Sequence, residues 1–272
     1  MGIRAVLDAR APLRVREALR VKLLRVVDDV VSRHRREQTD EIVARVRAEV
    51  RSEVDRVIEA IRAVEIRDRR DTFAAAEREA VASTARFVQR EMTAARHFDH
   101  PHATLEHALA LAPAGGMVLE FGVYTGTTLK IIAAQRDGEV YGFDSFDGLP
   151  EDWRIGFASG TFDVEAPPEV PGAELVVGLF DDSLPGFLAA HPGTVDLLHI
   201  DADLYSSAAS VLEQVGPRLR TGSVVVFDEF FNYPGWEAHE ARAWAEYAEA
   251  HDLAFRYEAY TLDNEQVVVR LT

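Results

Sequence analysis

Two apolar segments of the chain each end in acidic residues, at a spacing that would bring those acids together. Residues 195–200 lead into Asp201, and residues 223–227 lead into Asp228 and Glu229. Asp201 and Asp228 are 27 residues apart, which is enough for a helix and a returning strand. Buried parallel strands read as apolar runs, and ligands bind outside their carboxyl ends. We therefore expect these acids to meet at one sheet edge and to form a cation site.

The composition sets the broad class of the protein. With 272 residues, 47% of them apolar, the chain has material for one large α/β domain and an appendage. It has no cysteine, which excludes disulfides, thiolate zinc sites and cysteine nucleophiles, and is compatible with a reducing cytosol. Neither a long apolar run nor a signal peptide is found, so we expect a cytoplasmic protein without a membrane partner.

The charge is distributed unevenly along the chain. Residues 1–100 hold 22 Lys and Arg against 18 Asp and Glu, whereas residues 101–272 hold 8 against 28. A surface as acidic as the second segment repels phosphate backbones, which argues against nucleic acid as a partner. Solubility is the simplest explanation of this acidity, and attraction of a cationic substrate such as an amino sugar is the alternative.

The first hundred residues are predicted to be mostly helical. No Gly or Pro occurs between Pro12 and Pro101, and Arg, Glu, Ala and Val are abundant there. Seven apolar residues recur at an average step of 3.5: Val43, Val46, Val50, Val54, Val57, Ile61 and Val64. One narrow apolar stripe on a charged helix is typical of a coiled coil. We predict that residues 1–100 mediate homo-oligomerisation, with a helix or lid resting on the second domain as the alternative.

Residues 101–272 alternate short apolar runs with helical patterns. Five strands are expected, at residues 117–121, 139–143, 174–177, 195–200 and 223–227. Helices are expected between them, at residues 127–135 and 206–219, and residues 254–260 and 266–271 read as a terminal hairpin. Strand–helix alternation of this kind predicts a doubly wound, Rossmann-like α/β sheet of seven strands, five parallel and two in an antiparallel hairpin.

A glycine-containing turn follows the first of these strands. Gly122 and Gly126 allow the backbone to approach a ligand, and the free amides at the start of the next helix favour polar or anionic groups. The spacing is not that of dinucleotide enzymes, and Glu120 directly before the turn would repel a pyrophosphate. The same acid would suit the ammonium group of an amino acid.

A second acid, Asp144, ends the next strand, 24 residues beyond Glu120. In such folds an acid at this place accepts hydrogen bonds from ribose hydroxyls. Adenosine that carries an amino acid in place of a pyrophosphate is S-adenosylmethionine, which we expect as the cofactor.

Four segments, in order, resemble class I methyltransferases, and more narrowly the macrocin O-methyltransferase family of antibiotic-sugar enzymes. They are Glu120-Phe-Gly-Val-Tyr-Thr-Gly126, the segment from Tyr141 to Trp153, His199-Ile-Asp-Ala-Asp-Leu-Tyr205, and the segment from Phe227 to Trp236. The resemblance covers residues 100–272 and does not extend to the N-terminal hundred. We therefore place a domain boundary at residue 100.

The resemblance implies where the cofactor binds. Eight positions fall where the family holds the amino acid, ribose and adenine of S-adenosylmethionine: Glu120, Gly122, Tyr124, Gly126, Asp144, Ser145, Phe180 and Asp181. The long segment of residues 151–171, with its aromatic side chains, is where a substrate lid belongs.

The resemblance also implies a divalent-metal triad of Asp201, Asp228 and Glu229. In the family the last two ligands are commonly both Asp, and Glu229 departs from that pattern while still offering carboxylate oxygens. Such ligands select hard cations, so Mg²⁺ is expected first, with Ca²⁺ or Mn²⁺ as alternatives. A cation would lower the pKa of an acceptor hydroxyl and hold its oxygen towards the sulfonium methyl group. Asp201 is a candidate to receive the hydroxyl proton, and His239 is a second candidate.

Several nearby residues also have ordinary structural interpretations. Asp203 and Ser206 are expected to cap the helix that follows them. His199 shares a strand face with Asp201, and a histidine in that place is more often a structural group than a base.

These inferences predict a metal-dependent O-methyltransferase that acts on a hydroxyl of a sugar or another small secondary metabolite. A catechol-type O-methyltransferase is a second interpretation, because it uses a similar carboxylate metal site on the same fold. A non-catalytic scaffold that acts through its helical arm is a third. The identity of the acceptor is set by loop shape, which the sequence does not reveal.

Overall fold

The computed structural model describes residues 13–272, apart from the side chains of residues 13–16 and 68. The chain divides into two compact units, of which the first ends at Asp71 and the second runs over Thr72–Thr272. None of the described helices is both long and apolar enough to cross a membrane.

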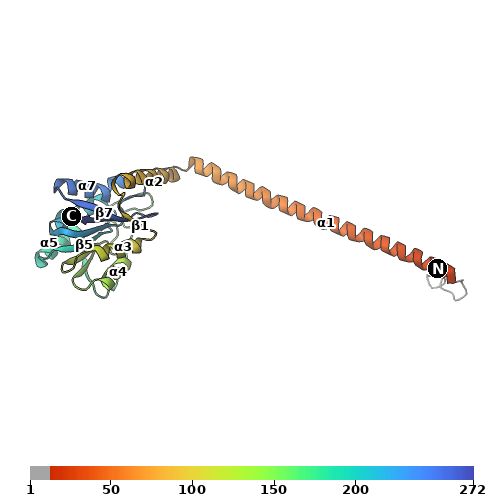
Figure 1. Ribbon diagram of the computed structural model, residues 1–272, viewed down its shortest axis with the longest axis horizontal. Coiled ribbons are helices and arrows are strands. Elements are labelled where there is room, and N and C mark those ends of the chain that lie inside the picture. Colours follow the sequence, from red (N-terminus) through yellow and green to blue (C-terminus); the bar gives the residue numbers. More distant parts are fainter. Residues whose placement is uncertain (1–12) are drawn as a thin grey trace. The chain divides into compact units, whose positions relative to one another are not determined.

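The described part of the first unit forms one helix, α1 (Leu13–Arg70), of 58 residues (Figure 1). The absence of Gly and Pro explains its length, and pairs such as Arg69 with Glu65 add i,i+4 support on its surface. The predicted stripe of Val and Ile lies exposed, from 40% at Val43 to 66% at Val64. The helix is thus confirmed, while its coiled-coil pairing stays a prediction.

The helix α2 (Thr72–Glu91) belongs to the second unit, so the boundary falls after Asp71 and not at residue 100. Its residues pack on the segment around Trp236. The Trp236 indole N–H donates to Ser83 Oγ at 2.8 Å, and the ring of Phe87 lies 5.5 Å from that of Trp236. These contacts tie α2 to the domain, and a helical periodicity alone does not say which body a helix packs against.

The second unit is built on one eight-stranded sheet. Along the chain its strands are β1 (Arg96–Phe98), β2 (Met117–Phe121), β3 (Val140–Asp144), β4 (Glu174–Val177), β5 (Val195–Ile200), β6 (Leu219–Phe227), β7 (Phe255–Thr261) and β8 (Val267–Leu271). Their order in the sheet is β1-β7-β8-β6-β5-β2-β3-β4. All neighbours are parallel except β8, which is antiparallel to β6 and β7. The predicted five parallel strands and terminal hairpin are confirmed, and β1 is an additional edge strand.

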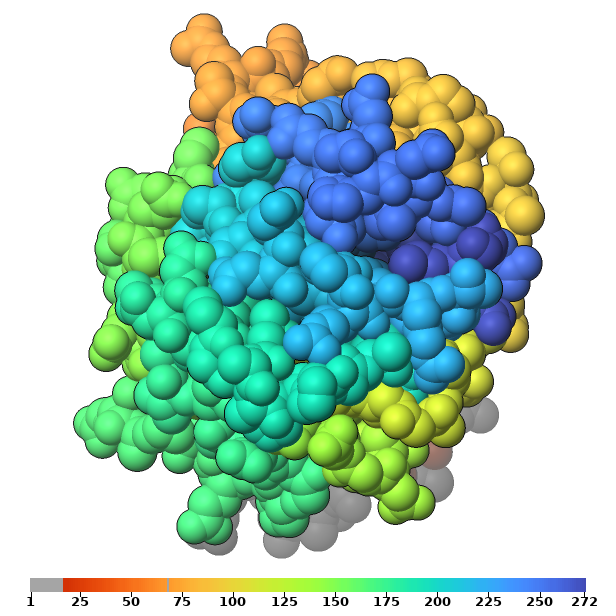
Figure 2. Space-filling view, turned by 90° about the vertical axis from the view of Figure 1, so that its left-hand side faces the viewer, coloured from red at the N-terminus to blue at the C-terminus, as the bar shows by residue number. Residues whose placement is uncertain are grey.

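Helices cover both faces of the sheet. One hydrophobic cluster joins α3 (Pro101–Leu111) and α4 (Thr127–Gln135) to one face. A second cluster joins α5 (Phe180–Ala190), α6 (Tyr205–Val215) and α7 (Glu240–Ala250) to the other face, and Figure 2 shows α7 in blue beside the cyan α6. Burial on both sides explains why the central strands are continuous apolar runs.

One helix is shorter than the sequence indicates. The helix expected over residues 206–219 ends at Val215, because a single turn of 3₁₀ helix, Gly216–Arg218, follows it and β6 begins at Leu219. The proline in this turn lacks the N–H that would continue the helix. A second such turn, Trp236–Ala238, precedes α7.

Candidate active site

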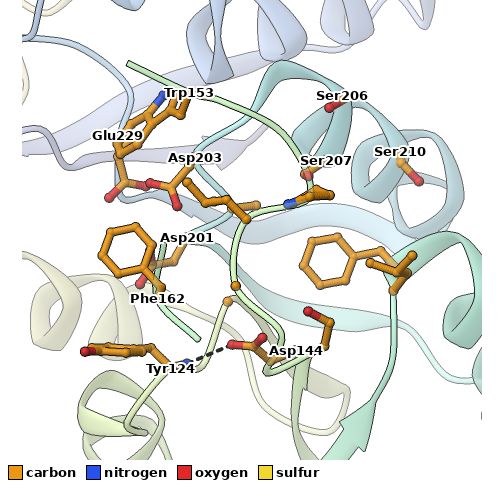
Figure 3. Close-up of a pocket in the computed structure, with 18 of the residues that line it drawn as sticks. Tyr124, Asp144, Trp153, Phe162, Asp201, Asp203, Ser206, Ser207, Ser210 and Glu229 are labelled. Atoms are coloured by element: carbon orange, nitrogen blue, oxygen red, sulfur yellow. Dashed lines mark hydrogen bonds between the residues drawn. The ribbon is translucent and has the colours of Figure 1, made fainter. Parts of the chain in front are cut away.

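A cavity of about 640 Å³ opens at the carboxyl ends of the central strands (Figure 3). Three sets of side chains meet there: the turn after β2, the ends of β3 and β4, and the acids after β5 and β6. Residues from each set line it, among them Tyr124, Asp144, Phe180, Asp201 and Glu229. A cavity of this size accommodates a small organic ligand.

The turn after β2 is held in place by Asp144. Its Oδ2 accepts hydrogen bonds from the backbone N–H groups of Val123 and Tyr124, both at 2.8 Å, and its Oδ1 accepts one from the Phe146 N–H at 2.7 Å. The carboxylate therefore fixes the shape of the loop as well as facing the cavity.

Position 122 requires a glycine because the backbone there packs against another part of the chain. Its φ is +94°, and a Cβ at this position would lie 1.7 Å from the carbonyl oxygen of Asp201. The turn after β2 thus packs directly against the first residue beyond β5. Close approach to a ligand, the expectation from sequence, is not needed to explain this glycine.

Six of the eight positions predicted for the cofactor line the cavity: Gly122, Tyr124, Asp144, Ser145, Phe180 and Asp181. The other two, Glu120 and Gly126, are not among its lining residues. Gly126 sits at the start of α4 with a φ of +77° and packs near Val170. Asp181 accepts hydrogen bonds from Ser210 and Gln214, so α6 orients it at the cavity.

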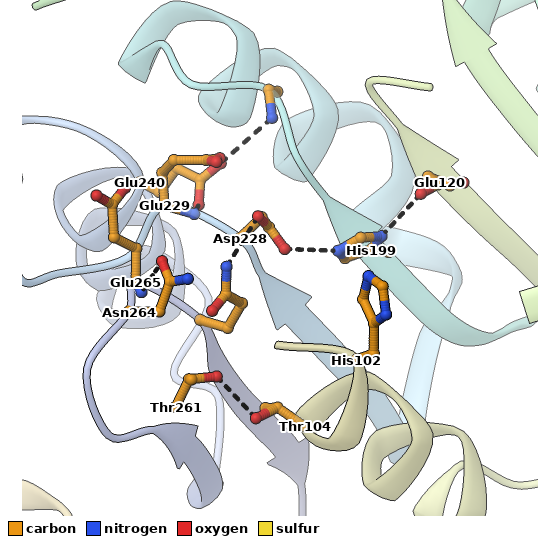
Figure 4. A network of polar contacts seen from close by, with 12 residues as sticks. His102, Thr104, Glu120, His199, Asp228, Glu229, Glu240, Thr261, Asn264 and Glu265 are labelled. Carbon is orange, nitrogen blue, oxygen red and sulfur yellow. Dashed lines mark hydrogen bonds and ion pairs between the residues drawn. The ribbon is translucent and has the colours of Figure 1, made fainter. Parts of the chain in front are cut away.

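Glu120 is completely buried and pairs with His199 (Figure 4). Its Oε1 lies 3.1 Å from His199 Nδ1, and His199 Nε2 lies 3.4 Å from Asp228 Oδ1. Burial alone would lower the pKa of His199, but the hydrogen bonds to Asp228 and Glu120 outweigh it and raise that pKa well above its usual value. The structure thus gives Glu120 a partner other than the cofactor ammonium, and makes His199 the support of a predicted metal ligand.

The acids after β5 and β6 are crowded. Burial, and then the charge of Asp228, raise the pKa of Asp201 well above its usual range. The pKa of Glu229 is also raised well above its usual range, by burial and then by the charges of Asp201 and Asp203. Burial acts in the same sense on Asp228, but its hydrogen bonds to His199, Gln266 and Glu229 leave its pKa lowered. These carboxylates repel one another, which is the electrostatic signature of a place that lacks positive charge.

Two buried residues that the sequence did not single out organise these acids. Gln266 of the region before β8 donates from Nε2 to Asp228 Oδ2 at 3.0 Å. Glu240, at the start of α7, accepts the backbone N–H of Glu229 at 3.1 Å and that of Ala202 at 3.4 Å. Neither residue follows an apolar strand, so only the folded chain brings it to the site.

The two helix caps predicted after β5 are wrong. No side chain caps α6, whose N-cap residue is Leu204. Asp203 instead has a φ of +60° and lines the cavity, where burial raises its pKa to about 7 against the lowering effect of Arg154. Ser206 donates to Glu151 Oε1 at 2.7 Å and so links α6 to the segment after β3.

His239 is not among the residues that line the active-site cavity. It lines a second cavity and not the first, its ring centroid is 6.5 Å from that of Trp153, and burial lowers its pKa. The role of proton acceptor predicted for it gains no geometric support.

Residues 145–173 connect β3 to β4 without a named helix or strand, and cover the cavity. Arg154 fastens this segment: its Nη1 pairs with both oxygens of Glu265, at 2.9 and 3.1 Å, and its guanidinium lies 3.9 Å from the ring centre of Trp153. The aromatic lid expected here has this anchor on the turn between β7 and β8.

The residues present fit a hard cation. Ligand atoms of His199, Asp201 and Asp228 lie within 4.8 Å of one another, although both ring nitrogens of His199 already have partners. Glu229 is outside that compact group, yet its Oε2 is buried without a hydrogen-bond partner. Oxygen donors with unsatisfied lone pairs and repelling charges are what Mg²⁺ or Ca²⁺ would complete.

Comparisons with known proteins match the part of the chain that forms the cavity. Residues 119–230 match the family model described as a methyltransferase domain. The chain is 29% identical over 169 residues to 8-demethyl-8-(2,3-dimethoxy-alpha-L-rhamnosyl)-tetracenomycin-C 4'-O-methyltransferase of Streptomyces olivaceus, a match that covers 53% of this chain and 63% of the relative. The chain thus spans less than two thirds of that relative's length.

Among solved structures, calicheamicin methyltransferase CalS11 aligns with a TM-score of 0.50 and 26% identity, over 62% of this chain and 76% of that one. The O-methyltransferase NovP aligns with a TM-score of 0.48 and 25% identity, over 62% of this chain and 79% of that one.

The fold and the cavity define a class I methyltransferase domain, the fold that uses S-adenosylmethionine. The tetracenomycin methyltransferase among these relatives agrees with the resemblance seen in the four sequence segments.

Proposed function

We propose that this protein transfers a methyl group from S-adenosylmethionine to a hydroxyl group of a sugar or another small natural product, with the help of a divalent cation. One observation carries the proposal: the turn held by Asp144 and the crowded acids Asp201 and Glu229 line the same cavity. The tetracenomycin enzyme and CalS11 support the class of acceptor.

In that cavity Tyr124, Ser145 and Phe180 would surround the cofactor. Asp201 and Glu229 of its lining, together with Asp228 next to Asp201, would hold the cation. When bound, the cofactor supplies an electrophilic methyl group and the cation lowers the pKa of the acceptor hydroxyl. His199 and Gln266 orient Asp228 from two sides. The lid would limit the access of water to the bound substrate.

The hydroxyl proton needs a nearby acceptor. Asp201 was predicted for this role, but as a cation ligand it would lose basicity. Asp203 lines the same cavity and has a pKa of about 7, close to the value at which a general base works best at neutral pH. We assign the proton to Asp203, with Asp201 as a ligand.

The test measures methyl transfer with labelled cofactor and a panel of glycosides and catechols, with Mg²⁺ or with a chelator. The proposal expects turnover of glycosides that the chelator abolishes and Mg²⁺ restores. Turnover of catechols alone would favour the catechol-type enzyme, and binding of no S-adenosylmethionine by calorimetry would favour a scaffold.

The helix α1 is proposed to mediate self-association through its stripe of Val and Ile. Apolar side chains exposed along one line of an isolated helix gain most by pairing with the same line of a second copy. Val50→Lys with Val57→Lys should lower the molar mass measured by light scattering, whereas Arg51→Lys on another face should leave it unchanged. Equal masses for all forms would contradict this assignment.

A further inference from the structure

The anchor of the lid lies next to a residue that orients a proposed cation ligand. Arg154 of the lid pairs with both oxygens of Glu265, in the turn between β7 and β8. The next residue in the chain, Gln266, donates from Nε2 to Asp228 Oδ2 at 3.0 Å. The carbonyl oxygen of Glu265 also accepts the backbone N–H of Phe230 at 3.1 Å. One short turn therefore contacts the lid, the acid Asp228 and the chain directly after the acids.

Arg154 is connected to the acids on a second side, through an aromatic ring. Its guanidinium carbon lies 4.5 Å from the ring centre of Tyr233, as well as 3.9 Å from that of Trp153 and 5.0 Å from that of Phe157. The Tyr233 hydroxyl donates to the carbonyl oxygen of Glu229 at 3.3 Å. Aromatic faces and carboxylates both attract a guanidinium, so three rings and one carboxylate hold this cation in place.

The links from Arg154 to Asp228 are largely buried. The side chains of Arg154 and Glu265 are 22% and 18% exposed, and Gln266 is 5% exposed. A shielded, two-pronged pair of Arg and carboxylate has a fixed geometry, whereas exposed ion pairs do not. Gln266 Oε1 is buried without a partner, so the contact to Asp228 is the one hydrogen bond that this amide makes among residues 13–272. A shift of Glu265 would therefore move the donor away from Asp228.

We propose that Arg154 is a positioning residue for the cation site, and that docking of the lid and binding of the cation favour each other. While Arg154 is docked, it holds the turn that presents Gln266 to Asp228. When the lid opens, Arg154 leaves Glu265, and Asp228 loses a fixed donor. The inference rests on the proposed function and adds the dependence of its cation site on the lid. Linkage is reciprocal, so a cation that binds the docked form more tightly stabilises docking by the same factor.

Arg154→Lys tests the positioning role, because lysine keeps the charge but loses the two-pronged contact and the flat group that lies on the rings. The affinity for Mg²⁺, measured by calorimetry without cofactor or substrate, should fall about tenfold. Arg256→Lys is the matched control, since the Arg256 side chain is 59% exposed on β7 and pairs there with Glu258. Its affinity for Mg²⁺ should equal that of the wild type. An unchanged affinity in Arg154→Lys would overturn the inference.

Two more variants separate positioning from a purely electrostatic role. Arg154→Met removes a positive charge near carboxylates, which by itself would strengthen the binding of a cation. The inference expects the opposite sign, a weaker affinity for Mg²⁺, and a stronger one would overturn it. Arg154→Lys combined with Gln266→Leu should lower the affinity by well under the about hundredfold that two independent tenfold effects would give, because both act on Asp228 through one amide. A full hundredfold loss would overturn the route through Gln266.

Trypsin provides the reciprocal measurement, because it cleaves after Arg and the next residue, Ile155, is 81% exposed. Arg154 must leave Glu265 before the protease can bind it, so cleavage there follows the fraction of open lid. Saturating Mg²⁺ should slow this cleavage, identified by mass spectrometry, about tenfold in the wild type and about threefold or less in Gln266→Leu. Cleavage after Arg51 of α1 should be independent of Mg²⁺. Equal slowing in both proteins would overturn the inference.

These measurements distinguish the possible failures. Circular dichroism should be the same in all variants and shows that they fold. The slowing of trypsin in the wild type needs no variant, so its absence overturns the inference even if a variant does not fold. If the wild type binds Mg²⁺ without any link to the lid, the inference alone fails. If the wild type binds no Mg²⁺, the cation site of the proposed function fails, and the inference fails with it.

Discussion

The two sides of the active-site cavity treat their carboxylates in opposite ways. At the end of β3, both oxygens of Asp144 accept backbone N–H groups, so the protein itself satisfies this acid. Beyond β5 and β6, Asp201 and Glu229 have raised pKa values, and Glu229 Oε2 is buried without a partner.

This difference distinguishes an acid that shapes a loop from acids that await a positive charge. A carboxylate surrounded by N–H donors is complete in the folded chain, and it keeps its role whether or not a ligand is bound. Buried carboxylates that repel one another cost folding free energy, which only a cation or a proton relieves. The comparison predicts that removing an acid after β5 or β6 lowers turnover, whereas removing Asp144 lowers the affinity for the cofactor.

The largest effect is expected on the side of the crowded acids. Asp228→Ala removes a proposed cation ligand and leaves His199 and Gln266 without their shared acceptor. Turnover should fall about a thousandfold, while calorimetry shows an affinity for S-adenosylmethionine within about twofold of wild type. A comparable loss of cofactor affinity would mean that the two sides are not separate.

On the other side, Asp144→Ala should weaken the binding of S-adenosylmethionine about a hundredfold, because three backbone N–H groups lose their acceptor and the turn after β2 loses its shape. Asp147→Ala is the control, since Asp147 is exposed and lies outside the cavity lining. Unchanged cofactor affinity in the Asp144 variant would show that the loop is held by other means.

A smaller effect is expected from Gln266→Leu, which keeps the volume of the side chain but removes the donor to Asp228. Affinity for Mg²⁺, followed by calorimetry in the absence of substrate, should fall about tenfold, as for other residues that orient a metal ligand. Gln214→Leu, which loses a contact to Asp181 instead, should leave Mg²⁺ affinity unchanged. If the two variants bind Mg²⁺ equally well, Gln266 does not position Asp228.

The smallest effect concerns pH. The folded protein holds the Asp203 proton up to about pH 7, whereas the unfolded chain releases it near the usual value of 3.8. Between these values the folded state binds the Asp203 proton and the unfolded state does not, so the contribution of Asp203 to the free energy of unfolding should fall as pH rises and level off above about pH 7.

Thermal unfolding in a chelator at several pH values would measure this slope. Asp203→Asn should reduce the slope of stability against pH by about the contribution of one titrating carboxyl group. Mg²⁺ should reduce the same slope in the wild type, because it supplies the missing positive charge. Identical slopes for the variant and the wild type would contradict the assignment.

The sequence predicted the scaffold well, because long apolar runs and an absence of helix breakers depend on local chemistry. The bounds of β2, β4, β5 and α4 agree with the expected ranges. The strand β1 was missed, since three residues show no periodicity and β1 exists only by pairing with β7. The domain boundary was misplaced for a related reason, as the packing of α2 is tertiary.

Within the site, the sequence located acids more reliably than it assigned them. The pairing of Glu120 with His199 was within reach, because both are next to last in neighbouring strands and lie opposite each other in register. Asp203 was taken for a cap because a short acid before a helix usually is one. Gln266 and Glu240 carry no sequence signal, since their contacts arise from the folded arrangement of β8 and α7.

The contact between Gly122 and the carbonyl of Asp201 has a consequence for how this protein can change over evolution. The cofactor turn and the acidic rim touch through their main chains, so no side-chain replacement can adjust one without displacing the other. New acceptors would therefore have to be acquired through changes in the lid, which lines the same cavity. The cofactor turn and the acidic residues would therefore be conserved together.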